Sequence, residues 1–306
     1  MRARRAGRCT GAAVASSNIG RVVLWMMGAL LSFTAMAVSV RELGSALSVV
    51  EMLAIRNIAG LAVLGGLALA RPELRQALHT RRLPLHGLRN VIHFGAQCGW
   101  AEGLLLLPLS TVFALEFTAP IWVALLAVLI LGERMTASRF ASVVLGFLGV
   151  LVILRPGFAS IQPAMLLVLA AAVGFACVSI ATKRLTATES TFTILFYMNL
   201  MQLPMNLAFS DPVFVTKLHI GHLWPVLGMA VSGLTSHFCL TNAFRSGDAI
   251  LVVPLDFLRI PLIALVGWIA YGESLQLAVL LGAALIVAGI VGNLWNESRR
   301  IDRPGS

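Results

Sequence analysis

The chain has 306 residues, of which 58% are apolar and 12% are charged, and its mean hydropathy is +0.90. A soluble domain carries roughly twice that share of charged residues, about 25%. We therefore exclude an ordinary soluble protein and predict an integral membrane protein, whose apolar side chains face lipid as well as one another.

The net charge of +10 does not indicate nucleic-acid binding. Most Lys and Arg residues lie in short runs between apolar segments, such as Arg81-Arg82 and Arg299-Arg300. Basic loops of this kind set the orientation of a membrane protein. The cysteines form no CxxC pair, and no set of residues has metal-ligand spacing. We predict no nucleic-acid partner, no metal and no cofactor.

Ten apolar segments are long enough to cross a bilayer, which needs about 20 apolar residues per helix. In chain order they lie near residues 22–40, 48–70, 87–106, 110–131, 137–154, 164–181, 191–209, 223–244, 249–271 and 275–295. They lack the alternation of outer-membrane strands. We predict an all-α bundle of ten transmembrane helices between two cytosolic tails, 1–20 and 297–306.

The distribution of Lys and Arg predicts that both termini face the cytosol. With the N-terminus inside, cytosolic segments hold 18 of the 23 Lys and Arg residues. In this count Arg89 belongs to a cytosolic segment, whereas Arg56 and Arg259 lie within spans. The first segment also resembles a cleavable signal peptide, although it is longer than most signal cores.

An internal repeat relates the two halves of the chain. A shift of 140 residues superimposes short stretches in pairs: Gly132-Glu133 on Gly272-Glu273, and Glu116-Phe117 on Asp256-Phe257. Because each copy has an odd number of spans, the second copy enters the membrane upside down. Inverted repeats are typical of secondary transporters, with the substrate site at their interface. We expect the copies to cover 21–155 and 156–296.

The stretches Gly132-Glu133-Arg134-Met135-Thr136 and Gly272-Glu273-Ser274, each followed by a Gly-rich apolar helix, resemble the EamA-type repeats of the drug/metabolite transporter superfamily. Arg56 in the second span fits the same pattern. Within the family, VFALEFTAP at 112–120 and DFLRIP at 256–261 are most similar to the bacterial riboflavin-importer branch, which is also similar to S-adenosylmethionine carriers.

The resemblance implies a secondary transporter of a small organic metabolite in the bacterial inner membrane, working as a monomer or homodimer. Riboflavin uptake is the first expectation. S-adenosylmethionine, an amino acid or another metabolite, carried in either direction, is the alternative.

Ionisable residues inside spans are costly to bury, and each is a candidate for function. They are Glu51, Arg56, Glu102, Glu116, Asp256 and Arg259, with His93 and His237 as weaker cases. Asp256 and Arg259 are three residues apart on one helix face, so we expect them to pair. Such a pair serves either helix packing or substrate binding and gating.

Prolines interrupt the fourth and ninth predicted spans at corresponding places. Pro120 and Pro261 each remove a backbone hydrogen bond, and Pro254 adds a third break. Matching interruptions in two repeats indicate a transporter site, and a simple kink is the alternative. The candidates for coupling and gating are Glu116, Arg56, Pro120, Pro254 and Pro261.

A polar stripe in the third span predicts an internal cavity. Asn90, His93, Gln97 and Trp100 recur at three or four residues, so they share a face that turns away from lipid. The Trp100 ring is suited to stacking on a planar ligand. A similar stripe in the seventh span contains Asn199, Gln202 and Asn206. The candidates for substrate binding are Asn90, His93, Gln97, Trp100, Glu116, Phe117, Asp256, Phe257 and Arg259.

Two other patterns predict structural roles. Glu133 and Glu273 precede helices and are expected to cap the positive ends of those helices. Ala284, Ala288 and Gly292 form a small-residue face that is expected to pack against another helix.

The repeat also superimposes two acidic positions with different neighbours. Asp256 has Arg259 on its own face, whereas Glu116 has only apolar residues at the same spacings. We hypothesise that Glu116, not Asp256, exchanges a proton and couples transport to a proton gradient. The assignment assumes that no cation from another helix, such as Arg56, reaches Glu116.

The alternatives to a secondary transporter are weaker. A primary pump needs a phosphate-binding loop, and neither Lys183 nor Lys217 lies in one. A membrane-embedded enzyme is disfavoured because the chain has no HExxH motif and no large loop to hold a catalytic site. A scaffold subunit needs neither an inverted repeat nor a polar interior. We predict that the protein is not an enzyme.

Overall fold

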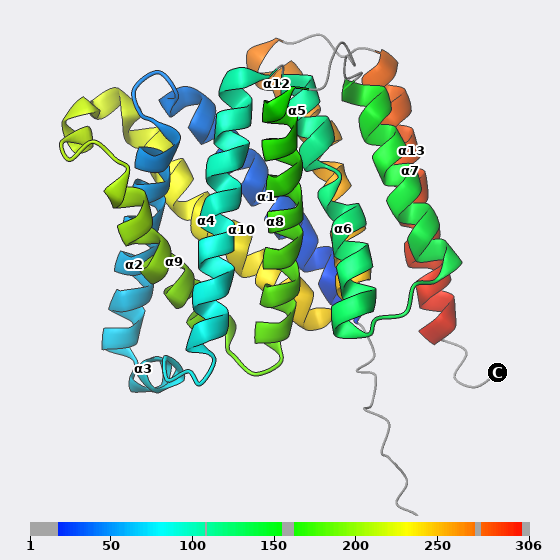
Figure 1. Ribbon diagram of the computed structural model, residues 1–306, viewed down its shortest axis with the longest axis horizontal. Coiled ribbons are helices and arrows are strands. Elements are labelled where there is room, and N and C mark those ends of the chain that lie inside the picture. The colour runs from blue at the N-terminus through cyan, green and yellow to red at the C-terminus, as the bar shows by residue number, and fades with distance from the viewer. Residues whose placement is uncertain (1–17, 108, 155–161, 273–276, 302–306) are drawn as a thin grey trace, which may run out of the picture.

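The computed structural model describes residues 18–107, 109–154, 162–272 and 277–301, and every regular element within these ranges is a helix (Figure 1). The first half contains α1 (Ile19–Leu43), α2 (Val49–Ala70), α3 (Pro72–Ala77), α4 (Leu83–Leu106), α5 (Leu109–Glu116), α6 (Ala119–Leu126), the π-helical turn η1 (Ala127–Leu131) and α7 (Ala137–Leu154). The second half contains α8 (Pro163–Thr186), α9 (Thr191–Ala208), the 3-10 turns η2 (Phe214–Lys217) and η3 (Ile220–His222), α10 (Leu223–Ser246), α11 (Ala249–Val252), the 3-10 helix η4 (Val253–Leu258), α12 (Arg259–Tyr271) and α13 (Leu277–Ile301).

Six helical stretches among the described residues are long and apolar enough to cross a membrane. They are Ile19–Leu43, Val49–Ala70, Pro163–Thr186, Ile220–Ser246, Ala249–Ala270 and Leu277–Arg299. Shorter apolar helices cover Ala119–Leu131 and Ala137–Ile153. The helices α4 and α9, of 24 and 18 residues, carry the two predicted polar stripes, which lower their hydropathy. The helix α3 lies between the second and third predicted spans.

Side chains define where several helices begin. Asn18 accepts a hydrogen bond from the Arg21 backbone N–H at 3.1 Å and caps α1. Ser48 and Glu51 form a reciprocal capping box at the start of α2. The Glu51 carboxylate also pairs with Lys217 at 2.8 Å. Glu51 therefore caps the N-terminus of α2, although the sequence placed it among the ionisable residues inside spans.

The elements recur along the chain with the predicted offset. The starts of α4, α5, α6 and α7 precede those of α10, α11, α12 and α13 by 140 residues each. Gly132 and Gly272 end the corresponding helices with φ of 69° and 66°, a left-handed conformation that glycine adopts without strain. In Figure 1 α4 runs upward while its counterpart α10 runs downward, so these two helices have opposite directions.

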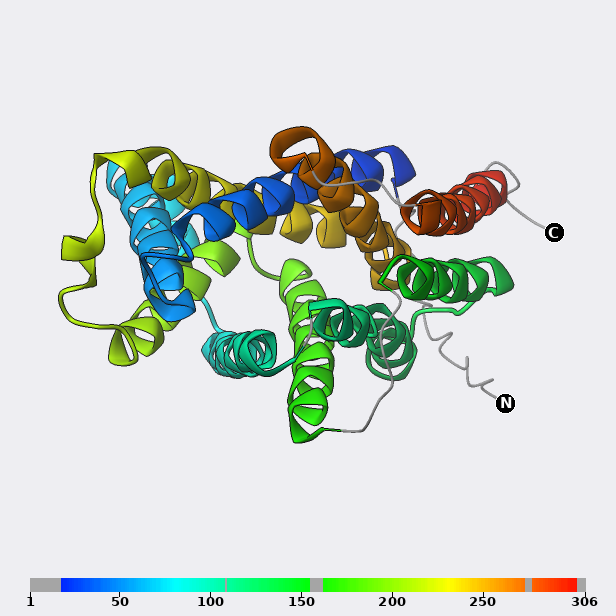
Figure 2. The same ribbon diagram turned by 90° about the horizontal axis from the view of Figure 1, so that it is seen from above.

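The helix pairing follows the same relation. α1 packs against α10 and α8 packs against α4, while α2 packs against α9 and α7 packs against α13 (Figure 2). Each of these pairs joins the first half of the chain to the second. The largest buried apolar cluster surrounds α11 and η4, and includes Phe117 and Phe257. The interrupted segments thus lie in the interior of the bundle.

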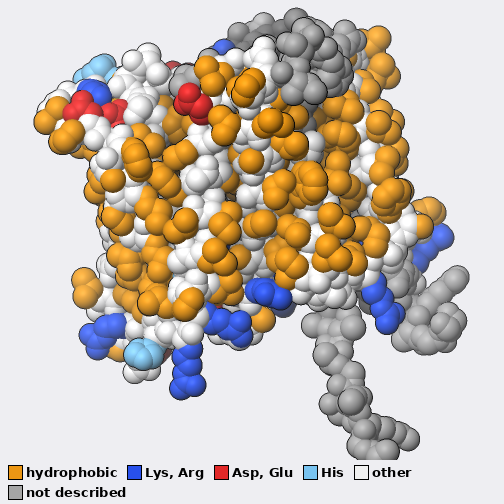
Figure 3. All heavy atoms as spheres, in the orientation of Figure 1, with side chains coloured by type: hydrophobic (Ala, Val, Ile, Leu, Met, Phe, Trp, Pro, Cys, Tyr) orange, Lys and Arg blue, Asp and Glu red, His pale blue; other side chains and the backbone are white. Residues whose placement is uncertain are grey.

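The two ends of the bundle differ in charge. α1 begins and α13 ends at one end of the bundle (Figure 1). Figure 3 shows Lys and Arg side chains gathered there and apolar side chains over the belt between the ends. We call it the basic end.

The α7–α13 contact depends on glycines that the sequence did not single out. A Cβ on Gly282 would lie 2.5 Å from the carbonyl oxygen of Gly149, and a Cβ on Gly149 would lie 2.6 Å from that of Gly282. The predicted small-residue face was wrong, because Ala284 and Ala288 are exposed and Gly292 has no neighbour within 4 Å. The face of α13 that packs against α7 is instead formed by Gly282, Ile286 and Gly289.

Gly282→Ala should destabilise the protein, because the new methyl group has no space between α13 and α7. We expect a loss of about 1–3 kcal/mol in the free energy of unfolding, as for other overpacked contacts. Gly292→Ala on the same helix is the control and should gain up to about 1 kcal/mol from helix propensity. Thermal unfolding of the detergent-solubilised variants measures both. Equal midpoints would contradict the close α7–α13 contact.

Candidate functional site

Two interrupted helices meet in the interior of the bundle. α5 ends at Glu116 and α6 begins at Ala119, and in the second half α11 gives way to the 3-10 helix η4 before α12 begins at Arg259. The predicted proline breaks in both halves are therefore present. Phe117 and Phe257, which the repeat superimposes, stack with ring centroids 6.1 Å apart and an interplanar angle of 29°.

A charged group that we call the acidic cluster, Glu116, Asp256 and Arg259, lies beside these rings. Arg259 Nη2 is 2.7 Å from Asp256 Oδ2, which confirms the predicted pair. The same nitrogen is 3.6 Å from Glu116 Oε1. The prediction that Glu116 lacks a cation was therefore wrong. Its cation comes from the other half of the chain, and it is Arg259 rather than Arg56.

Aromatic rings enclose the acidic cluster. Trp100 Nε1 donates a hydrogen bond of 2.7 Å to Glu116 Oε2. The Arg259 guanidinium lies over the rings of Phe33 and Phe117, at 5.3 and 5.1 Å from their centroids. The side chains of Asp256 and Arg259 remain 26% and 23% exposed. The cluster thus combines two carboxylates, one guanidinium and several aromatic faces in a partly accessible interior position.

A second polar group, which we call the arginine cluster, contains Arg56, Arg89, Asn90, His93 and Gln202. Arg56 Nη2 donates to Gln202 Oε1 at 3.2 Å, and Gln202 Nε2 lies 2.7 Å from His93 Nδ1. Arg89 Nη1 donates to Asn90 Oδ1 at 3.0 Å. The Asn90 oxygen also accepts from Gln202 Nε2 at 3.3 Å. This network joins α2, α4 and α9 in the interior.

The structure divides the predicted stripe of the third span between the two clusters. Asn90 and His93 belong to the arginine cluster, and Trp100 is hydrogen-bonded to the acidic cluster. Gln97 lies between them on α4, and its Oε1 is buried without a partner. Glu102 is exposed near the end of the same helix.

Sequence reasoning missed Arg89 and Phe33 and left the role of Gln202 open. Arg89 was counted as a cytosolic loop residue, which was wrong, because α4 begins at Leu83 and buries Arg89 in its second turn. The signal that would have found it is spacing, since Arg89 and His93 are four residues apart and so share a helix face. The position of Phe33 depends on how α1 packs, which no local pattern indicates.

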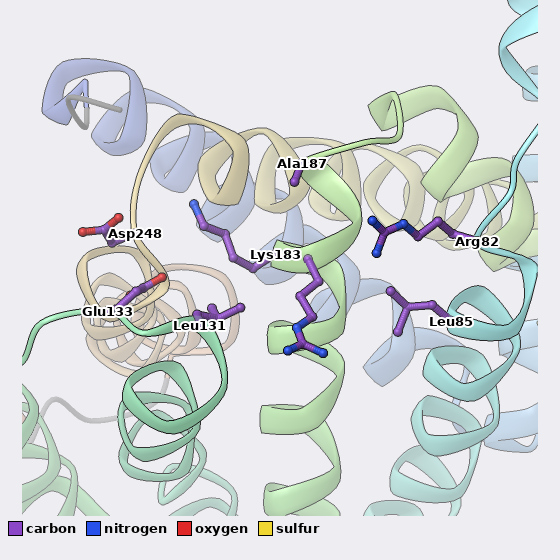
Figure 4. Close-up of a pocket in the computed structure, with 8 residues that line it drawn as sticks. Arg82, Leu85, Leu131, Glu133, Lys183, Ala187 and Asp248 are labelled. Atoms are coloured by element: carbon purple, nitrogen blue, oxygen red, sulfur yellow. The ribbon is translucent and has the colours of Figure 1, made fainter. Parts of the chain in front are cut away.

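A cavity of about 450 Å³ opens at the basic end (Figure 4). It is lined by Arg82, Leu85, Leu131, Glu133, Lys183, Arg184, Ala187 and Asp248. Lys183 donates to the carbonyl oxygens of Phe244 and Gly247 at the end of α10. Three basic and two acidic side chains therefore surround the opening, and none of them belongs to either cluster.

The Glu133 carboxylate accepts hydrogen bonds from the backbone N–H groups of Ala249 and Ile250, at 2.8 and 3.0 Å. Glu133 was expected to cap the following helix, α7, but it caps α11 in the other half of the chain. Burial raises the pKa of this carboxyl above its usual value, and the two N–H donors oppose that shift. Glu273, the second predicted cap, lies outside the described residues.

Next to this cap, two ion pairs join the two halves of the chain at the basic end. Arg139 Nη2 lies 3.0 Å from Asp248 Oδ2 and 2.5 Å from Glu297 Oε1. Arg139 belongs to the first half of the chain, and both carboxylates belong to the second. The two halves are thus held together at this end by charged side chains as well as by apolar packing.

Comparisons with known proteins agree with this architecture. The model of the EamA-like transporter family matches residues 20–155 and again 162–295. A riboflavin transporter of Rhizobium johnstonii is 31% identical over 96% of this chain and 98% of its own. An S-adenosylmethionine uptake transporter of Rickettsia felis is 26% identical over 91% of this chain and 94% of its own. A pseudopaline exporter of Pseudomonas aeruginosa is 26% identical over 88% of this chain and 94% of its own.

A solved crystal structure superimposes with a TM-score of 0.76 over 93% of this chain and 99% of the other, at 19% identity, and so shares the fold. The bacterial relatives and the apolar helices identify a multi-pass protein of the bacterial inner membrane. The two family matches cover nearly the whole chain, which therefore belongs to the EamA-like transporter family.

Proposed function

We propose that this protein is a secondary transporter that carries a small organic metabolite by alternating access. In this proposal two inverted five-helix repeats, 21–155 and 156–296, provide ten transmembrane helices, and both termini face the cytosol. The observation that carries the proposal is the meeting of two repeat-related helix breaks beside the acidic cluster. Freed backbone groups and ionisable side chains at such breaks are the usual components of a transporter site.

The acidic cluster suits a gate as well as a binding site. Arg259 lies closer to Asp256 of its own half than to Glu116 of the other half, by 2.7 against 3.6 Å. Movement of one repeat against the other changes the second distance directly, because the two partners belong to different repeats. Substrate bound between the aromatic faces would therefore alter this contact. The hypothesis of proton coupling through Glu116 now requires that the 3.6 Å contact with Arg259 open when the repeats move.

We propose riboflavin as the first substrate candidate. The relative named as a riboflavin transporter aligns over almost the full length of both chains. The isoalloxazine ring is planar and polar at its edges, which matches a site that offers the half-buried rings of Trp100 and Phe33 beside hydrogen-bonding carboxylates. Uptake into the cell is the direction in this proposal.

S-adenosylmethionine is the second candidate, because specific features favour it. Its cationic sulfonium and amino groups would be attracted to the Glu116 and Asp256 carboxylates and to the aromatic faces nearby. Its adenine ring would use the same stacking surfaces. The relative named as an uptake transporter of this compound covers 91% of the chain.

Purified protein in proteoliposomes should take up labelled riboflavin or S-adenosylmethionine above the level of protein-free vesicles. Trp100→Ala should raise the apparent KM by about 2- to 10-fold, because a stacking surface is lost. Trp224→Ala is the control, since that ring is 80% exposed. An unchanged KM in Trp100→Ala would place Trp100 outside the site. No uptake of any compound from a metabolite panel would contradict transport.

Glu116→Gln and Asp256→Asn should have different effects in the same vesicles. Glu116→Gln should abolish gradient-driven accumulation and leave counterflow exchange intact, because the amide cannot carry a proton but can still accept from Trp100. Asp256→Asn should impair both modes and lower the free energy of unfolding by about 1.5–3 kcal/mol, because the 2.7 Å bond to Arg259 is lost. Exposed Glu102→Gln serves as the control. Proton-driven accumulation in Glu116→Gln would refute the coupling role.

Reporter fusions test the proposed topology. Fusions after Arg82 and at the C-terminus should report the cytosol, because the basic end is expected to face inward. A fusion near Lys217 should report the opposite side. A cytosolic signal near Lys217 would rule out the inverted repeat, and with it the alternating-access mechanism proposed above.

A further inference from the structure

The arginine cluster contains two buried cations without an anionic partner. Arg56 and Arg89 are each 3% exposed. Among the described residues no Asp or Glu lies within ion-pair distance of either guanidinium. The other buried or half-buried arginines of the interior, Arg139 and Arg259, each contact two carboxylates. Arg56 and Arg89 therefore depart from the rule that buried charges are compensated by an opposite charge.

The hydrogen bonds of Arg56 are also incomplete. Its Nη2 donates to Gln202, whereas its Nε is buried and has no partner. Arg89 donates to Thr182, Asn90 and the Met198 sulfur, and it repels Arg56 electrostatically. A guanidinium has five N–H donors, so Arg56 retains the capacity to bind an acceptor.

A glycine on α10 leaves space for the Arg56 side chain. A Cβ on Gly233 of α10 would lie 2.5 Å from Cδ of Arg56, so only a glycine lets the arginine stem pass into the interior. His93 and His237, whose ring centroids are 5.8 Å apart, lie next to the guanidinium groups and supply no negative charge. Neutral amide and imidazole groups thus position two cations that repel each other.

The arginine cluster and the cavity at the basic end share the helices α4 and α8. Arg82, Lys183 and Arg184 line the cavity. Arg89 lies seven residues beyond Arg82 on α4, which corresponds to a rise of about 10 Å. Arg89 Nε donates to Thr182 at 2.8 Å, and Thr182 directly precedes Lys183. Basic side chains would therefore attract an anion to the cavity, and further cations lie deeper in the bundle on the same two helices.

We infer that Arg56 and Arg89 form a subsite for an acidic group, a carboxylate or a phosphate, on the transported compound. This inference rests on the proposed transport function and narrows its substrate class: of the two candidates it favours S-adenosylmethionine, which carries a carboxylate, over neutral riboflavin. The acidic group would accept hydrogen bonds from both guanidinium groups and compensate their charge, as arginines commonly do for these anions. The acidic cluster and the aromatic rings beside it would bind the remainder of the same molecule. A neutral compound would leave both cations uncompensated.

Two pairs of compounds that differ only in the acidic group test the subsite. They are riboflavin with riboflavin 5′-phosphate, and S-adenosylmethionine with its decarboxylated form. Binding to the purified full-length protein is measured by thermal shift and titration at constant ionic strength. We expect the acid-bearing member of at least one pair to bind about tenfold or more tightly than its partner, as charged hydrogen bonds predict. Equal binding within both pairs would overturn the subsite.

Variants separate a binding role from a structural one. Arg56→Gln and Arg89→Gln should remove the preference for the acidic member, whereas Arg56→Lys should keep part of it. Arg75→Gln, at an exposed position of α3, removes the same charge and should keep the full preference. Without ligand, Arg56→Gln should unfold at no lower temperature than the wild-type protein, because an uncompensated buried charge is removed. A lowered midpoint with an unchanged acid preference would overturn the inference.

Uptake in proteoliposomes distinguishes the failure of this inference from that of the proposed function. Uptake of neutral riboflavin without any acid preference would support transport and overturn the subsite. Acid-selective binding without uptake of either acid-bearing compound would support the subsite and contradict transport of these compounds.

Discussion

The architecture depends on the cost of leaving a polar group without a partner inside a membrane. Lipid offers no hydrogen bonds, so a broken helix or a buried charge is costly unless neighbouring helices or a ligand satisfy it. Helix breaks in the two halves meet at one interior place, and Arg259 contacts carboxylates from both halves there. The same requirement explains why α4 and α9, which carry the polar stripes, pack with other helices in the interior.

The sequence predicted features that arise from local pattern. Apolar length located the helices, the 140-residue offset located the repeat, and the prolines located the breaks. The pairing of Asp256 with Arg259 followed from their spacing on one helix. Each of these depends on residues that are close in the chain, where helix geometry alone fixes which side chains meet.

Contacts between distant segments could not be predicted in the same way. Arg259 at the start of α12 reaches Glu116 at the end of α5 because the two helix breaks meet in the interior, and no spacing in the sequence indicates that distance. The packing face of α13 was misjudged because a small-residue motif shows that close packing is feasible without saying which face is used. Arg89 was misplaced because helix ends are uncertain by several residues from sequence, and a few residues decide whether an arginine lies in a loop or in the interior.

Glu133 has a consequence for the independence of the two repeats. Its carboxylate caps the N-terminus of α11, and Arg139 forms ion pairs with Asp248 and Glu297. Side chains of the first repeat therefore satisfy polar groups of the second. A half-molecule made alone would leave those backbone N–H groups and carboxylates without these partners. The repeats are therefore not interchangeable modules. Any change at these positions in one half constrains what the other half tolerates, and the two must evolve as one unit.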